Sequence, residues 1–280
     1  MLYPSNYVNK IINRIVWVTQ KNTEAEENKV LKKEELKEKI RKSNFAMEQI
    51  NRVKSISIWV FIVPFVAVNA CLIITTQLHF LIESQYRIFM PFPYLDGGVS
   101  ISRTARYFPT YLIFKPAMFL TAYLLILYWI NNRKIINFFD NKNKYKNKIV
   151  YFGVASAVAL ILHSIFLGVK FDNDLYKLFR RIIMFVFIIF EIVAQTYLVI
   201  TLYSIKEKVF KHINKNVLRL KLFLVSTLII VAIISIPIIS LPGDDFYGIN
   251  LKYLKHALEW DYFIGVIAFY LLTFLMWKKS

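Results

Sequence analysis

The chain has 280 residues and a net charge of +18, and hydrophobic residues make up 57% of it against 19% charged residues. A soluble globular domain is about half apolar and about a quarter charged. The composition therefore argues against a soluble enzyme and excludes disordered, collagen-like and disulfide-stapled proteins. The single cysteine, Cys71, has no partner for an internal disulfide.

The first segment, residues 1–55, is basic and has the pattern of a helical arm. In residues 6–20, apolar side chains recur at helical spacing, which is typical of a short amphipathic helix on a membrane surface. Residues 28–55 carry a second helical pattern, with a broken apolar stripe and opposite charges four residues apart, such as Glu38 and Lys42. The arm is either a solvated helix that leads into the membrane or a partner-binding or lipid-sensing element, and both interpretations stay open.

Six apolar runs follow the arm, and each is long enough to cross a bilayer, which takes about 20 residues as a helix. Because these runs lack the alternation of a transmembrane barrel strand, we expect helices. The sequence predicts an all-α, polytopic membrane protein, a six-helix bundle with a transmembrane domain over residues 56–277. The expected spans are 56–78, 108–130, 149–169, 182–203, 222–241 and 261–277.

Basic residues divide unequally between the two sides of these spans. The arm, the 131–148 and 204–221 connections and the C-terminal tail hold 26 of the 36 Lys and Arg residues, whereas the other three connections hold nine. The positive-inside rule places the basic side, with both termini, in the cytoplasm of a multi-pass protein, without identifying the membrane. The excess charge is then a topology signal and an attraction for anionic inner-leaflet headgroups. We expect no nucleic-acid partner.

A few polar side chains interrupt the apolar runs, and an ionisable group inside a membrane marks a functional site by default. At a rise of about 1.5 Å per residue, they lie roughly 9–13 Å from the outer ends of the expected helices, as around one outer-leaflet cavity. Lys115 and Glu191 form the expected ion pair, because an unpaired ion at this depth would neutralise. Interhelical packing and snorkelling of Lys115 are the alternative explanation. The pocket candidates are Asn69, Lys115, His163, Glu191 and Gln195, with Ser235 and Tyr270 in the same layer.

The 79–107 connection is the longest on the outer side, and its Pro, Gly and Asp residues favour ordered turns over a long helix. Its second half runs into the second span as PYLDGGVSISRTARYFPTYLIF, residues 93–114. This stretch resembles the first outer loop of the Frag/DRAM/Sfk family of six-span membrane proteins. Members carry a Pro-aromatic start, Ile-Ser-Asp-Thr-Gly, an aromatic-Pro pair, an acidic residue and a Phe opening the second span. The matching residues are Ile101, Ser102, Thr104, Tyr107, Pro109 and Phe114, and the departures are Arg103, Ala105 and Thr110.

The resemblance implies a six-span fold with cytoplasmic termini and a lipid-handling or scaffold role that has no agreed catalytic chemistry. The residues themselves add a pair of arginines, Arg103 and Arg106, at the outer headgroup level. Arginine suits bidentate contact with phosphate, so these two residues are headgroup candidates. An ordinary interfacial anchor is the alternative for both.

Catalytic and metal-binding motifs are absent from the sequence. No histidine has a second histidine three or four residues away, and H-E-x-x-H, G-x-S-x-G and P-loop patterns are missing. We therefore expect no catalytic residues, metal ligands or cofactors.

The leading hypothesis is a non-enzymatic, Frag/DRAM/Sfk-like protein that binds or organises membrane lipids through the outer-leaflet pocket. A small-molecule or lipid transporter is the alternative, because polar groups inside the spans are typical of one. A third hypothesis is an outer-face, metal-dependent lipid hydrolase. Its ligands would be His79, His256 and one of the aspartates Asp96, Asp244 or Asp245.

Overall fold

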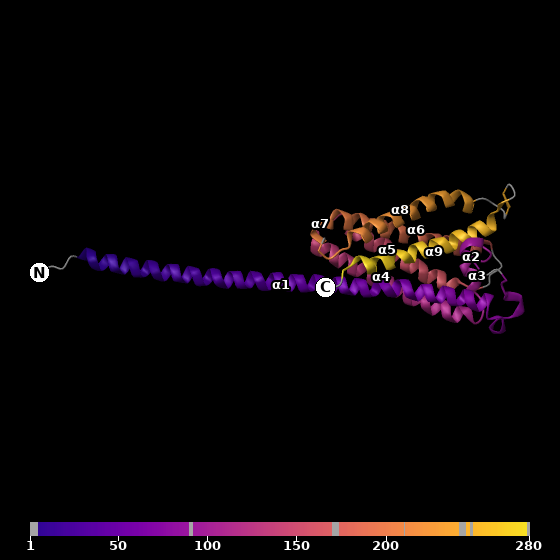
Figure 1. The fold of residues 1–280 in the computed structure, drawn as a ribbon, viewed down its shortest axis with the longest axis horizontal. Coiled ribbons are helices and arrows are strands. Elements are labelled where there is room, and N and C mark those ends of the chain that lie inside the picture. Colours follow the sequence, from indigo (N-terminus) through magenta and orange to yellow (C-terminus); the bar gives the residue numbers. More distant parts are fainter. Residues whose placement is uncertain are drawn as a thin grey trace. The chain divides into compact units, whose positions relative to one another are not determined.

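A computed structural model describes residues 5–89, 92–169, 174–209, 211–240, 245–246 and 249–278. Over these ranges the chain is almost entirely helical, as predicted. Six long helices dominate it (Figure 1): α1 Ser5–Thr76, α4 Thr110–Phe139, α5 Lys146–Phe166, α6 Asp174–Ser204, α8 Lys215–Ser240 and α9 Leu251–Met276. The short elements are α2 Pro93–Asp96, α3 Ile101–Thr104, α7 Lys206–Val209, the 3-10 turns His79–Leu81 and Ser84–Tyr86, and the antiparallel pair β1 Asp245–Phe246 and β2 Ile249–Asn250.

Six helical segments of the described chain are long and apolar enough to cross a membrane, which confirms the all-α polytopic bundle. Several of these helices are longer than the apolar runs expected from the sequence. The run 261–277, for example, belongs to α9, which already begins at Leu251, and α8 begins at Lys215 rather than at residue 222. Lys and Arg remain helical at such ends because their long side chains carry the charge back toward water.

By its internal packing the chain divides into Met1–Glu48 and Gln49–Ser280. The first unit is helical from Ser5 onward without a break, so the expected separate helices 6–20 and 28–55 are one continuous helix. No Gly or Pro interrupts the intervening residues, which are mostly good helix formers. Side chains 31–45 of this unit are exposed, and Lys42 pairs with Glu38 over 2.6 Å.

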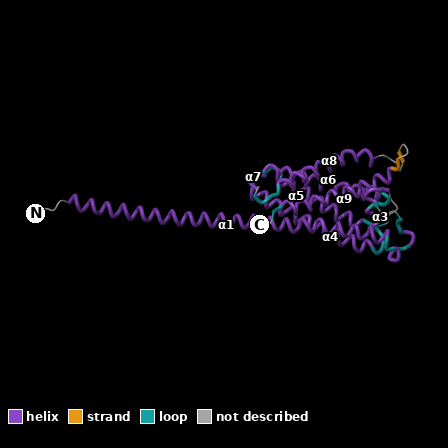
Figure 2. Tube along the Cα trace, in the orientation of Figure 1, coloured by secondary structure: helices purple, strands orange, loops and turns teal. Residues whose placement is uncertain are grey.

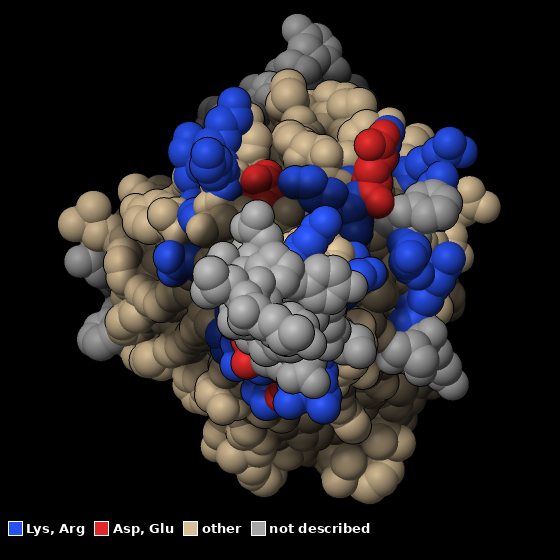
Figure 3. All heavy atoms as spheres, turned by 90° about the vertical axis from the view of Figure 1, so that its left-hand side faces the viewer, with Lys and Arg blue, Asp and Glu red and all other residues tan. Residues whose placement is uncertain are grey.

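Within Gln49–Ser280, α5 packs against α4 and α6, and α8 packs against α9 and α6. The connections gather at two opposite ends (Figure 2). At one of them, which we call the basic end, Lys208 Nζ lies 3.3 Å from the Phe139 carbonyl, and Lys54 Nζ lies 2.7 Å from the Trp277 carbonyl. Lys and Arg side chains gather on this end (Figure 3).

The opposite end, the loop end, carries α2 and α3 (Figure 1), and over the described residues 79–89 and 92–107 the long connection forms short helices and turns rather than a long helix, as predicted. Gly97 ends α2 with φ of +61°, and a Cβ there would lie 1.8 Å from the Tyr253 carbonyl oxygen of α9. Trp260 Nε1 donates to the Val99 carbonyl over 2.8 Å. The backbone of the loop is thereby fixed against the beginning of α9.

Candidate functional site

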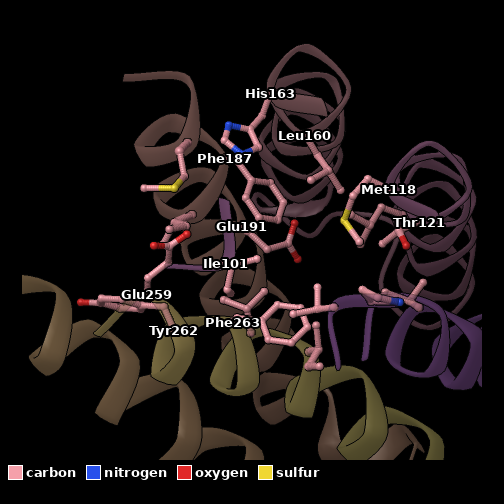
Figure 4. Close-up of a pocket in the computed structure, with 18 of the residues that line it drawn as sticks. Ile101, Met118, Thr121, Leu160, His163, Phe187, Glu191, Glu259, Tyr262 and Phe263 are labelled. Atoms are coloured by element: carbon pink, nitrogen blue, oxygen red, sulfur yellow. The ribbon is translucent and has the colours of Figure 1, made fainter. Parts of the chain in front are cut away.

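A cavity of about 100 Å³ lies between α1, α4, α5, α6 and α9, with Ile101 of α3 also in its wall. Helical spacing explains this wall, since residues three, four and seven apart share one face of a helix. Met184, Phe187, Ile188 and Glu191 line it from α6 at such spacings. The wall is mostly apolar, and Figure 4 shows the Glu191 carboxylate in the midst of its side chains.

Glu191 is fully buried and binds side chains from three helices. Its carboxylate accepts hydrogen bonds from Ser156 Oγ of α5 at 2.5 Å, from Gln195 Nε2 of α6 at 3.2 Å, and from the Tyr270 hydroxyl of α9. A buried carboxylate is tolerated when such donors replace its hydration. The carboxylate therefore joins the three helices at one point on the cavity wall.

Aromatic rings pack behind this carboxylate. The ring centroid of Tyr128 lies 4.9 Å from those of both Trp129 and Tyr270, with edge-to-face geometry. Gly153 of α5 makes room for the indole, because a Cβ at that position would lie 2.3 Å from the Trp129 ring. The absence of a side chain at Gly153 thus serves the packing of one tryptophan.

A second buried ionisable side chain, Lys221, lies near the same aromatic rings. Its ammonium lies 2.7 Å from Thr273 Oγ1 and 3.8 Å from the centroid of the Phe269 ring. Thr273 Oγ1 in turn lies 3.1 Å from the Tyr128 hydroxyl, which packs beside Tyr270. These contacts therefore run from Lys221 to the neighbours of Glu191.

The sequence analysis counted Lys221 among the residues of the 204–221 connection, which was wrong. The residue lies inside α8 and is fully buried. The missed signal is its position on a helical stripe with Leu218, Val225 and Leu228, all of which are buried. A lysine that continues an apolar stripe faces the interior of the bundle.

The predicted ion pair between Lys115 and Glu191 does not form among the described residues. Lys115 Nζ donates instead to the Ile165 carbonyl over 3.4 Å, near the loop end of α5. Glu191 is at the centre of the apolar segment Leu178–Ser204, because α6 extends further toward the loop end than expected. Lys115 and Glu191 therefore lie at different levels along the bundle.

Of the other pocket candidates, two lie at the cavity or beside Glu191, and one does not. His163 lines the cavity, and Gln195 reaches both Glu191 and the Val266 carbonyl, the latter over 3.2 Å. Asn69 is not among the residues that line the cavity. Its Oδ1 instead accepts a hydrogen bond from the Tyr94 hydroxyl of α2 over 3.0 Å. Burial raises the pKa of Tyr94, and this hydrogen bond acts in the opposite direction.

Ser235 and Tyr270, which were expected in the same layer as the pocket candidates, have different hydrogen-bond partners. Tyr270 binds Glu191, whereas Ser235 accepts a hydrogen bond from the Tyr262 hydroxyl over 3.1 Å.

The two headgroup candidates have different surroundings. Arg103 is exposed, whereas Arg106 is half-buried and close enough to Glu259 of α9 to interact with it electrostatically. Glu259 also lines the cavity and accepts a 3.4 Å hydrogen bond from the Ser102 backbone N–H. The sequence analysis missed Glu259 because it placed this residue in a connection, yet it is on the face of α9 that also carries Tyr262, Phe263 and Val266.

The described residues contain no group of three His, Cys, Asp or Glu side chains that could hold a metal ion. His256 Nδ1 donates to the Gly97 carbonyl over 2.9 Å, and Asp96 Oδ1 accepts from the Gly98 N–H over 2.7 Å. Both side chains thus take part in the structure of the loop. The His79 side chain and Asp244 lie outside what the structure describes.

Comparison with protein-family models gives no match for this chain, and comparisons with curated proteins and with solved structures give none either.

Proposed function

We propose that this integral membrane protein binds a membrane lipid in the cavity beside Glu191, as the resemblance to the Frag/DRAM/Sfk family implies. The observation that carries the proposal is the cavity itself, lined mostly by apolar side chains of five long helices. Protein interiors are normally close-packed, and an empty apolar cavity forfeits dispersion contacts. An apolar chain is the kind of group that regains those contacts.

The charge distribution supports an orientation for this lipid site. Lys and Arg are concentrated in the segments of the basic end, so the positive-inside rule assigns that end to the cytoplasm and to anionic inner-leaflet headgroups. The loop end, with α2 and α3, then faces the opposite leaflet. A lipid that reaches the cavity near His163 and Glu259 would come from that leaflet.

The test is a pair of matched substitutions on α1. Val68 lines the cavity and is 1% exposed, whereas Val66, two residues away, is 57% exposed. Val68→Phe fills the cavity, and Val66→Phe adds the same ring on the outer surface of the helix. Native mass spectrometry of detergent-purified protein should show a retained lipid in the wild type and in Val66→Phe, and should show none in Val68→Phe.

A second variant guards against misfolding of Val68→Phe. Phe187→Ala enlarges the same cavity without overpacking it, and it should retain lipid. Equal lipid retention by the wild type, Val66→Phe and Val68→Phe, with all three folded, would remove the cavity as the binding site.

One observation favours a transporter as a second candidate. Hydrogen bonds run from Lys221 of the basic-end half of α8 through Thr273 to Tyr128. The Tyr128 ring packs edge-to-face against Tyr270, which donates to the carboxylate on the cavity wall. Buried polar groups between opposite ends of a bundle are typical of carriers. A transporter should move substrate across liposome membranes and lose flux in Glu191→Gln, whereas a lipid-binding protein should retain lipid without flux.

A further inference from the structure

Three basic side chains near the loop end of the cavity carry buried nitrogen atoms without hydrogen-bond partners. They are Nε of Arg106, Nε of Arg180 and Nδ1 of His163. Buried polar groups in folded proteins nearly always have partners, so each exception calls for a ligand or a function. His163 is in the cavity wall, which places one of the three at the cavity itself. We call these three residues the loop-end cluster.

Three segments of the chain bring the cluster together. Arg106 follows α3, and its Cγ lies 3.6 Å from where a Cβ on Gly168, just after α5, would be. Arg180 lies on the first turns of α6, with its guanidinium 5.9 Å from the Tyr176 ring, and Tyr176 donates to the Phe166 carbonyl at the end of α5. Arg180 is also near enough to both His163 and Arg106 to interact electrostatically with them.

The charges of this region do not balance. Two guanidinium groups, Arg106 and Arg180, are close to one another, and Glu259 is the carboxylate that interacts with Arg106. Neighbouring like charges repel, and the interaction is strongest where water is excluded. Among the side chains that the structure describes here, one positive charge therefore remains uncompensated at the margin of an apolar cavity.

We propose that the loop-end cluster binds the phosphate of an anionic phospholipid whose acyl chain enters the cavity, an inference that rests on the proposed function. A guanidinium fork matches phosphate oxygens with two parallel hydrogen bonds, and the Nε atoms now without partners are suitable donors. A net charge of −1 on the headgroup compensates the excess charge of the cluster. Arg180 was not among the headgroup candidates expected from the sequence. Arg103, which was a candidate, is exposed and does not belong to the cluster.

The test compares substitutions of the two cluster arginines with the same substitution of two exposed arginines nearby. Arg103 and Arg181 are exposed neighbours of Arg106 and Arg180, so Arg103→Gln and Arg181→Gln control for the loss of one positive charge. Each variant is purified in detergent and offered equal amounts of phosphatidylglycerol and phosphatidylcholine with the same acyl chains. Native mass spectrometry gives the ratio of the two bound lipids.

We expect the wild type and both controls to prefer phosphatidylglycerol about tenfold, the size of effect that one charge-assisted hydrogen bond gives. Arg106→Gln and Arg180→Gln should lose this preference. Arg106→Lys, which keeps the charge but lacks the fork, should retain part of it and guards against an unfolded glutamine variant. The same preference in all variants would overturn the assignment.

Two further arms separate this inference from the proposed function. If the wild type binds neither lipid, the proposed function fails; if it binds both equally and Val68→Phe abolishes binding, only the headgroup assignment fails. Inorganic phosphate should leave the melting temperature unchanged. Stabilisation by phosphate that is lost in Arg106→Gln would identify a site for a free anion instead of a lipid.

Discussion

The ammonium of Lys221 donates a hydrogen bond to the hydroxyl of Thr273 over 2.7 Å, and both side chains are buried between α8 and α9. The Phe269 ring lies beneath the same ammonium. Removing the acceptor and removing the donor of this contact have different effects on stability. Loss of the acceptor leaves a buried donor unsatisfied, whereas loss of the charge removes the need for an acceptor.

Thr273→Val should therefore lower the free energy of unfolding by about 1–3 kcal/mol, the typical cost of an unsatisfied buried group. Lys221→Met should be neutral or stabilising, because a methionine fills similar space without a charge to desolvate. Thermal unfolding in detergent measures both. Thr227→Val is the control, since that hydroxyl is exposed on α8 and bonds only within its own helix, to the Phe223 carbonyl. A Lys221→Met protein as unstable as Thr273→Val would contradict this account.

Glu191→Leu should destabilise the bundle by about 1–3 kcal/mol, mainly because the Tyr270 hydroxyl loses its acceptor. Ser156 and Gln195 keep backbone acceptors, the carbonyls of Gly153 and Val266. Adding Tyr270→Phe to Glu191→Leu should restore part of the loss. A double-mutant cycle on thermal stability measures this coupling, and strictly additive effects would show that Tyr270 does not depend on Glu191.

Gly153→Ala should destabilise the protein by about 1–3 kcal/mol through overpacking, because the added methyl meets the rigid Trp129 indole at 2.3 Å. Gly265→Ala is the comparison. Its methyl meets Leu228 Cδ2 at 2.6 Å, at the end of a side chain that can rotate away. Unfolding of the two variants in detergent should rank Gly153→Ala as clearly less stable. The reverse order would mean that the indole moves more easily than its packing indicates.

Gly97→Ala should detach the 79–107 connection at the loop end from α9. The residue has φ of +61°, and its Cβ would lie 1.8 Å from the Tyr253 carbonyl oxygen, so both the backbone and the contact are disturbed. Limited proteolysis of residues 79–107 should become much faster. Gly98→Ala is the control, because the positive-φ glycines of the described chain are Gly97 and Gly168. Equal protection of both variants would contradict the close approach of Gly97 to α9.

The sequence by itself determined the transmembrane architecture of this protein. Each apolar run predicted a membrane-spanning helix, since transfer of a helix into lipid depends on the residues within that helix alone. The turns of the described part of the 79–107 connection were also predictable from local sequence, because Gly97 and its Pro and Asp neighbours favour turns. Helix ends were less predictable, since polar residues such as Lys215 can continue a helix.

The partners of the charged residues were decided only by the tertiary structure. Lys115 and Glu191 matched in charge, yet Lys115 reaches the end of α5, while Glu191 is satisfied by Ser156, Gln195 and Tyr270. Which side chains meet depends on the rotation and packing of helices far apart in the chain, and hydropathy does not encode these. The meeting of Arg106 with Arg180 next to the cavity has the same origin.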